Sequence, residues 1–254
     1  MRKELKLFGF SINQRRQIRY GKKAGLTREQ INIYAKTEFD WIQMEEIRRG
    51  FERGLSIEQV LVYAKPKFDS NQMSLVRKGF EEGLTYSRIR VYARPDVFNA
   101  DQMYAIFNGF DIGLSLEQVL FYAKPENDAS IMRVIMYALK NKLDIKKIQS
   151  YLRPEFAASQ LRAVYEGYFA NLPEGQIQFY ARPRLYNGGQ MKQILEGFKS
   201  KLSFDKIKFY ANPDYNDYKM EELRKGFEGG LDWKQINKLG YLQEQNLIYF
   251  KCQR

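Results

Sequence analysis

The chain of 254 residues contains no histidine. Histidine is the commonest general base and the commonest ligand of transition metals, so its absence excludes Ser-His-Asp and Cys-His catalysis and the usual zinc sites. No glycine-rich phosphate loop and no metal-ligand spacing replaces them. Adjacent carboxylates such as Glu45 and Glu46 point to different parts of a helix surface and make no acid–base pair. We therefore expect no enzyme, no cofactor, no metal and no small-molecule substrate.

Cysteine and long apolar runs are also scarce. Cys252 is the only cysteine, so no internal disulfide can form, which fits a reducing cytoplasm. No stretch approaches the roughly 18 uninterrupted apolar residues of a membrane span, and the first residues lack the apolar run of a signal peptide. The sequence predicts a folded, cytoplasmic protein with no membrane partner.

Positive charge is abundant but unevenly spread. The net charge is +12, and residues 1–28 hold nine Lys or Arg and one Glu. The remaining 226 residues therefore carry only +4. Five cations crowd one short predicted helix although like charges at this spacing repel: Arg15, Arg16, Arg19, Lys22 and Lys23. Such a surface indicates a nucleic acid or an acidic protein surface as partner, with a merely solvated helix end as the alternative.

A repeat governs most of the chain. One leucine recurs every 29 or 30 residues, at Leu26, Leu55, Leu84, Leu114, Leu143, Leu172, Leu202 and Leu231. Eight positions after seven of these leucines stands a tyrosine: Tyr34, Tyr63, Tyr92, Tyr122, Tyr151, Tyr180 and Tyr210. Leu239 breaks the column in the last copy. Self-similarity at a fixed period of this length is typical of helical repeat proteins.

Each repeat predicts two helices. The first begins at a good N-cap residue: Thr27, Ser56, Thr85, Ser115, Asp144, Ser203 or Asp232. A glutamine three positions later completes a capping box in four copies, at Gln30, Gln59, Gln118 and Gln235. Proline is expected to stop this helix after roughly nine residues: Pro66, Pro95, Pro125, Pro154, Pro183 or Pro213.

The second helix carries a buried stripe, such as Met44, Ile47 and Phe51. A glycine column inside it predicts the close approach of another backbone: Gly21, Gly50, Gly79, Gly109, Gly167, Gly197 and Gly226, with Ala138 as the exception. A second column predicts a left-handed residue just after the helix: Gly25, Gly54, Gly83, Gly113, Gly230 and Asn171.

Neither helix of a repeat can bury its apolar face alone, whereas stacked repeats bury a continuous stripe. We therefore predict an all-α, right-handed α-solenoid of about eight two-helix repeats of 29–30 residues. It forms a single domain over residues 1–254, with an N-terminal cap at 1–12, repeats at 13–238 and a C-terminal cap at 239–254.

Two columns are candidates for binding. A cation ladder follows the Tyr-Ala pair: Lys36, Lys65, Arg94, Lys124, Arg153 and Arg182. These cations either offset the helix dipole or meet successive phosphates. A variable column lies one turn earlier: Asn32, Leu61, Arg90, Leu120, Gln149, Gln178, Lys208 and Asn237. Its polar members Asn32, Arg90, Gln149, Gln178 and Lys208 could reach base edges, or the column is an unconstrained solvent position.

The phrase "LSIEQVLVYAKP" followed by a second helix resembles, in pattern, two families. It is similar in length and order to the mitochondrial transcription termination factor repeat, and its first helix is similar to that of transcription-activator-like effector repeats. The resemblance spans Leu26 to Leu239 and implies a superhelix that binds duplex DNA. The effector family reads bases with a glycine-rich loop, and here residues 66–69 are Pro-Lys-Phe-Asp. No binding residue is therefore carried over.

Two functions follow from the sequence. The first is nucleic-acid binding through a basic repeat surface and the basic N-terminal helix. The second is a protein-interaction scaffold or inhibitor that binds a partner protein through the repeat surface.

Overall fold

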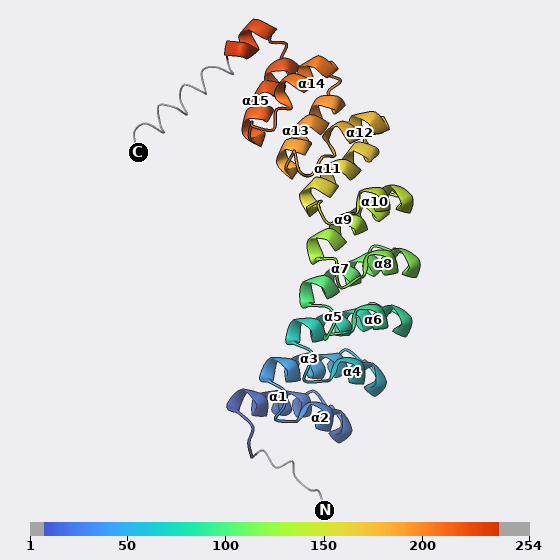
Figure 1. Ribbon diagram of the computed structural model, residues 1–254. Coiled ribbons are helices and arrows are strands. Elements are labelled where there is room, and N and C mark those ends of the chain that lie inside the picture. Colours follow the sequence, from blue (N-terminus) through green and yellow to red (C-terminus); the bar gives the residue numbers. More distant parts are fainter. Residues whose placement is uncertain (1–7, 239–254) are drawn as a thin grey trace, which may run out of the picture. The chain divides into compact units, whose positions relative to one another are not determined.

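The computed structural model describes residues 8–238, and every regular element among them is a helix (Figure 1). This confirms the all-α prediction. The chain divides into two compact units, Met1–Met136 and Tyr137–Arg254. None of the helices in residues 8–238 is long and apolar enough to cross a membrane. The predicted C-terminal cap and residues 1–7 of the N-terminal cap lie outside the described residues.

Long and short helices alternate along the described chain. The long helices have 12 residues each: α1 (Ile12–Lys23), α3 (Trp41–Glu52), α5 (Ser70–Glu81), α7 (Ala100–Asp111), α9 (Ala129–Lys140), α11 (Ala158–Phe169), α13 (Gly188–Lys199) and α15 (Asp217–Glu228). The short helices have 7 residues each: α2 (Arg28–Tyr34), α4 (Ile57–Tyr63), α6 (Tyr86–Tyr92), α8 (Leu116–Tyr122), α10 (Ile145–Tyr151), α12 (Glu174–Tyr180) and α14 (Phe204–Tyr210). Residues 233–238 are helical as well.

The predicted N-caps begin the short helices, except that α12 starts after Pro173. The capping boxes are present at all four glutamines, Gln30, Gln59, Gln118 and Gln235. Thr85 forms no capping box, and its hydroxyl hydrogen-bonds with the Ser87 hydroxyl at 2.8 Å instead. The third residue of its helix is Arg88, whose guanidinium has no acceptor for the N-cap amide.

Each short helix ends at its tyrosine, so the predicted length of roughly nine residues is wrong. Ala64, which follows Tyr63, has φ −71° and ψ 63°. This is an inverse γ-turn, in which the Lys65 amide donates to the Tyr63 carbonyl at 2.7 Å. Helix α2 ends in the same way although Thr37 stands at the proline position. The γ-turn therefore ends the helix, and proline only fits the extended chain beyond it.

The left-handed residues after the long helices are confirmed, with Gly25, Gly54, Gly83, Gly113, Gly230 and Asn171 all at positive φ. Two lysines share this conformation, Lys142 at φ 60° and Lys201 at φ 57°. A side chain at such a position costs about 1 kcal/mol or more, because its Cβ crowds the carbonyl that follows. The sequence pattern does not mark these two positions.

The glycine column of the long helices contacts a tyrosine side chain, and not another backbone as predicted. A Cβ atom at Gly109 would lie 1.9 Å from Tyr122 Oη, in the short helix that follows. At five other glycines of the column an added Cβ would lie 1.8 to 2.1 Å from the hydroxyl oxygen of the corresponding tyrosine: Gly21, Gly50, Gly79, Gly167 and Gly197. Tyr122 Oη donates to the Ala105 carbonyl at 3.2 Å, which fixes the ring against the long helix.

One repeat departs from this arrangement. Ala138 replaces the glycine, and the hydroxyl of Tyr151 donates instead to Glu174 Oε1 at 3.0 Å. Tyr168 donates to the other oxygen of that carboxylate at 2.8 Å. Burial, together with the hydrogen bond to Glu174, raises the pKa of Tyr151 to about 12. The repeat that has an alanine in place of the glycine is therefore the one in which the tyrosine hydroxyl bonds to a different partner.

A glutamine near the start of the long helices links neighbouring repeats. Gln102 Oε1 accepts from the Asn99 amide at 3.1 Å and closes a capping box. Its Nε2 donates to the carbonyls of Pro125 and Asn127 in the next repeat, at 3.1 and 2.8 Å. The same link to the next loop is made by Gln14, Gln43, Gln72, Gln160 and Gln190.

Within each unit, successive long helices pack side by side. In the first unit α1 contacts α3, α3 contacts α5, and α5 contacts α7. In the second unit α11 contacts α13, and α13 contacts α15. The stripe of Met44, Ile47 and Phe51 is buried as predicted. A further aromatic column, in the loop before the long helix, is buried as well: Phe39, Phe68, Phe98, Phe156 and Tyr186.

Candidate nucleic-acid interface

Helix α1 presents its basic side chains to solvent. Ile18, Gln14 and Gln17 form its buried face, and all five predicted cations are exposed. Arg15 Nε donates to the Phe10 carbonyl at 2.9 Å. Among residues 8–238, the other four cations form no ion pair: Arg16, Arg19, Lys22 and Lys23. Their charge is therefore not compensated by a described carboxylate.

All six cations of the ladder are exposed. Their backbone amides donate to the carbonyl of the preceding tyrosine in the γ-turn, as Arg94 does to Tyr92 at 2.6 Å. In the described part of the chain, none of the six side chains donates to a helix carbonyl. Five lie over an aromatic ring instead, at 5.2 to 5.9 Å from its centre: Lys36, Arg94, Lys124, Arg153 and Arg182. Their charged ends therefore lie over aromatic rings while the residues remain exposed.

Carboxylates lie beside this ladder. Lys36 and Arg153 form ion pairs with Glu38 and Glu155, at 3.7 and 3.6 Å. Lys67, in the same loops, pairs with Asp96 of the next repeat. Exposed ion pairs of this kind contribute little to stability, but they reduce the local positive potential. The loop edge is therefore mixed in charge.

Residues of the ladder and of the variable column line one groove between α4 and α6. A groove of about 440 Å³ is lined by the ladder residues Lys65 and Arg94 and by the variable-column residue Arg90. Glu58 stands at the same groove, and a hydrogen bond from the Ser56 hydroxyl lowers the pKa of its carboxyl. Three cations face one carboxylate, so the groove keeps a net positive charge.

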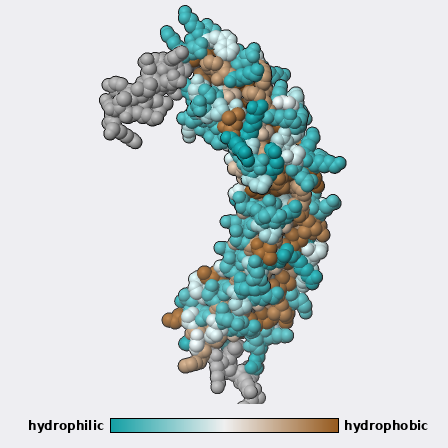
Figure 2. All heavy atoms as spheres, viewed as in Figure 1, coloured by the Kyte–Doolittle hydropathy of each residue, from teal (hydrophilic) through white to brown (hydrophobic). Residues whose placement is uncertain are grey.

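The remaining members of the variable column are scattered over the short helices. Gln178 donates to Glu174 Oε1 at 3.3 Å, and Lys208 lies over the ring of Phe204 at 4.5 Å. Leu61 and Leu120 are 47% and 51% exposed. Figure 2 shows hydrophobic side chains along the short helices α4, α6 and α8, where these leucines lie.

Several arginines are buried and unavailable for binding, which sequence reasoning did not detect. Arg77 Nε donates to Glu46 Oε2 at 2.9 Å, and its Nη1 donates to Glu81 at 2.6 Å. Arg48 and Arg224 occupy the same repeat position and pair with Glu52 and Glu228. The recurring Arg-x-x-x-Glu spacing was the available signal, since it places the pair on one face of a helix.

Comparison with protein-family models, with curated proteins and with solved structures gave no match to this chain. The class that the described residues define is an all-helical protein built from a repeated helix pair, with exposed cations on α1 and along the short helices.

Proposed function

We propose that this protein is a non-enzymatic, cytoplasmic α-solenoid of about eight repeats that binds nucleic acid through α1 and the α4–α6 groove. The observation that carries the proposal is the convergence of Lys65, Arg90 and Arg94 on one groove. The four α1 cations that form no ion pair with any of residues 8–238 support the proposal. Guanidinium and ammonium groups that are exposed and uncompensated are suited to phosphate oxygens.

The proposed contacts are to phosphates and not to bases. The polar members of the variable column do not form one continuous line of donors, since leucine interrupts them at α4 and α8. The resemblance to two families that bind duplex DNA supports a nucleic-acid partner but provides no binding code. Binding dominated by phosphates predicts low sequence preference and a strong dependence on salt.

Three variants test the proposal against a mixed-sequence DNA duplex. The first replaces the five α1 cations with glutamine, and the second is Arg90→Leu, the residue that α4 and α8 carry at the same position. The slope of log affinity against log salt should fall by roughly 0.9 for each phosphate that the variant no longer binds. The control is Arg162→Gln, an exposed cation of α11 that pairs with Glu166 at 2.9 Å. Equal slopes in all four proteins would reject the proposed interface.

A protein partner is the second candidate, and the exposed leucines favour it. Leu61 and Leu120 lie on α4 and α8, each with a ladder lysine four residues later. An exposed apolar patch with a polar rim is typical of protein-binding surfaces, and Figure 2 shows hydrophobic side chains along these short helices. Affinity capture from the native host should then recover a partner protein. Nuclease treatment should not reduce its recovery, whereas Leu61→Glu in the captured chain should abolish it. Disappearance of the captured material on nuclease treatment favours the first proposal.

A further inference from the structure

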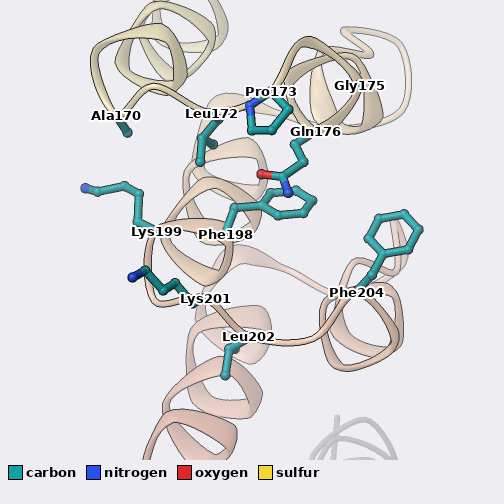
Figure 3. Close-up of a pocket in the computed structure, with 10 residues that line it drawn as sticks. All are labelled: Ala170, Leu172, Pro173, Gly175, Gln176, Phe198, Lys199, Lys201, Leu202 and Phe204. Carbon is teal, nitrogen blue, oxygen red and sulfur yellow. The ribbon is translucent and has the colours of Figure 1, made fainter.

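A hollow separates the starts of α12 and α14 in the second unit. It has a volume of about 730 Å³, and its apolar surface comes from Leu172, Phe198, Leu202 and Phe204. Figure 3 shows Lys199 and Lys201 extending at one end of this groove and Phe204 at the other. Phe204 is 44% exposed, whereas Phe198 is buried and Leu172 and Leu202 are half-buried. The groove thus exposes part of an aromatic ring, although this ring also contacts those of Phe179 and Phe198.

Gly175 leaves this groove open although the backbone does not require a glycine there. Gly175 is the second residue of α12, and no atom lies within 4 Å of the Cβ that another residue would add there. Its backbone is not in the left-handed region. A glycine inside a helix is unfavourable, and other short helices carry Glu58, Glu117 or Asp205 at this position. Gly175 therefore both widens the groove and removes a carboxylate from its wall.

The rim of the groove is positively charged. Lys201 is held at φ 57°, where most repeats have glycine, and within residues 8–238 it forms no ion pair. Lys199 pairs with Glu196 at 2.8 Å, and no carboxylate is among the residues that line the groove. The lysine side chain thus places a positive charge at the edge of an apolar hollow.

We propose that this α12–α14 groove binds a partner polypeptide through a large apolar side chain flanked by carboxylates. The apolar floor receives the side chain, and Lys201 with Lys199 meets the carboxylates. A nucleobase fits less well, because Lys208 lies 4.5 Å from the centre of the Phe204 ring and covers one of its faces. The groove lies in the second unit and shares no residue with α1 or the α4–α6 groove, so this inference does not depend on nucleic-acid binding.

Random peptides displayed on phage, selected against the full chain, test the inference. We expect the selected peptides to contain a large apolar residue next to Asp or Glu. Synthetic copies should bind Gly175→Leu and Lys201→Gly about tenfold more weakly or worse. Both variants should melt at the same temperature as the wild type or above it, since leucine enters open space and glycine relieves the left-handed position.

Lys142→Gly is the matched control, because Lys142 is also a left-handed lysine at the end of a long helix but does not line the groove. It should raise the melting temperature and leave peptide affinity unchanged. The inference is overturned by selection of no peptide, by selected peptides without carboxylates, or by equal affinity of Gly175→Leu and the wild type. A decrease in DNA or RNA affinity in Gly175→Leu would show that a nucleic acid occupies the groove, and would also overturn it.

Discussion

A double-mutant cycle on Gly109 and Tyr122 tests a contact that recurs between the long helices and the short helices that follow them. In Gly109→Ala the new methyl carbon would lie 1.9 Å from Tyr122 Oη, so the buried ring must move by more than about an ångström. Overpacking of a rigid core group costs about 3 kcal/mol, and alanine returns about 1 kcal/mol of helix propensity. We therefore expect a net decrease of about 2 kcal/mol in the free energy of unfolding.

The partner variant Tyr122→Phe removes the clashing oxygen. It removes the hydrogen bond to the Ala105 carbonyl, at a cost of about 1 kcal/mol. In the Tyr122→Phe background, the closest ring atom to the new Cβ at position 109 is Cζ of residue 122, at 3.1 Å. A shift of a few tenths of an ångström relieves this contact. The alanine should then be neutral or stabilising. The two changes should thus couple by about 2 kcal/mol.

Urea unfolding of the wild type, the two single variants and the double variant, monitored by circular dichroism, measures this coupling. The four curves are fitted with one common dependence of the unfolding free energy on urea concentration. Because the chain is a repeat protein, coincident transitions by fluorescence must accompany the fit. Additivity of the two single changes to within about 0.5 kcal/mol would refute the proposed contact between the glycine and the hydroxyl.

Three further changes have expected outcomes. Gly79→Leu should lower the free energy of unfolding by about 3 kcal/mol or more, because Tyr92 Oη and Ile89 Cδ1 lie 2.1 and 2.7 Å from the position of the new Cβ; an unchanged melting temperature would contradict this. Tyr63→Phe should be neutral or stabilising by about 1 kcal/mol, because within the described residues Tyr63 Oη is buried without a hydrogen-bond partner. A loss of stability as large as that of Tyr122→Phe would contradict this prediction. Gln102→Ala should cost roughly 2–3 kcal/mol against about 1 kcal/mol for Gln118→Ala, because only Gln102 also bonds the next repeat, and equal costs would rule out that link.

Local signals made the helices predictable from the sequence. The N-caps and capping boxes, such as Ser56 with Gln59, depend on residues three apart. The left-handed glycines depend on a conformation that other residues avoid, so Gly25 and Gly54 marked the helix ends directly. The end of the short helix was predicted too late, because Pro66 is a strong helix-stop signal while the γ-turn at Ala64 has no strong sequence signature.

Contacts between distant residues were not predictable in the same way. The glycine column indicated a close approach, but only the fold shows that a hydroxyl 13 residues later, such as Tyr122 beside Gly109, fills the space. Gln102 looked like an ordinary polar residue, because its second set of partners lies 23 and 25 residues further on. Arg90, Lys65 and Arg94 were separate candidates from the sequence, and only the packing of α4 beside α6 shows that they line one groove.

The salt dependence of nucleic-acid binding tests the central proposal most directly. Fluorescence anisotropy of labelled mixed-sequence DNA and RNA, titrated with the full chain over a series of salt concentrations, measures it. If α1 and the α4–α6 groove bind phosphates, log affinity should fall linearly with log salt, with a slope of about −0.9 per contact on duplex DNA. Little difference between sequences is expected. No binding at low salt, or an affinity that salt does not change, would contradict the proposal and leave the protein partner as the function to pursue.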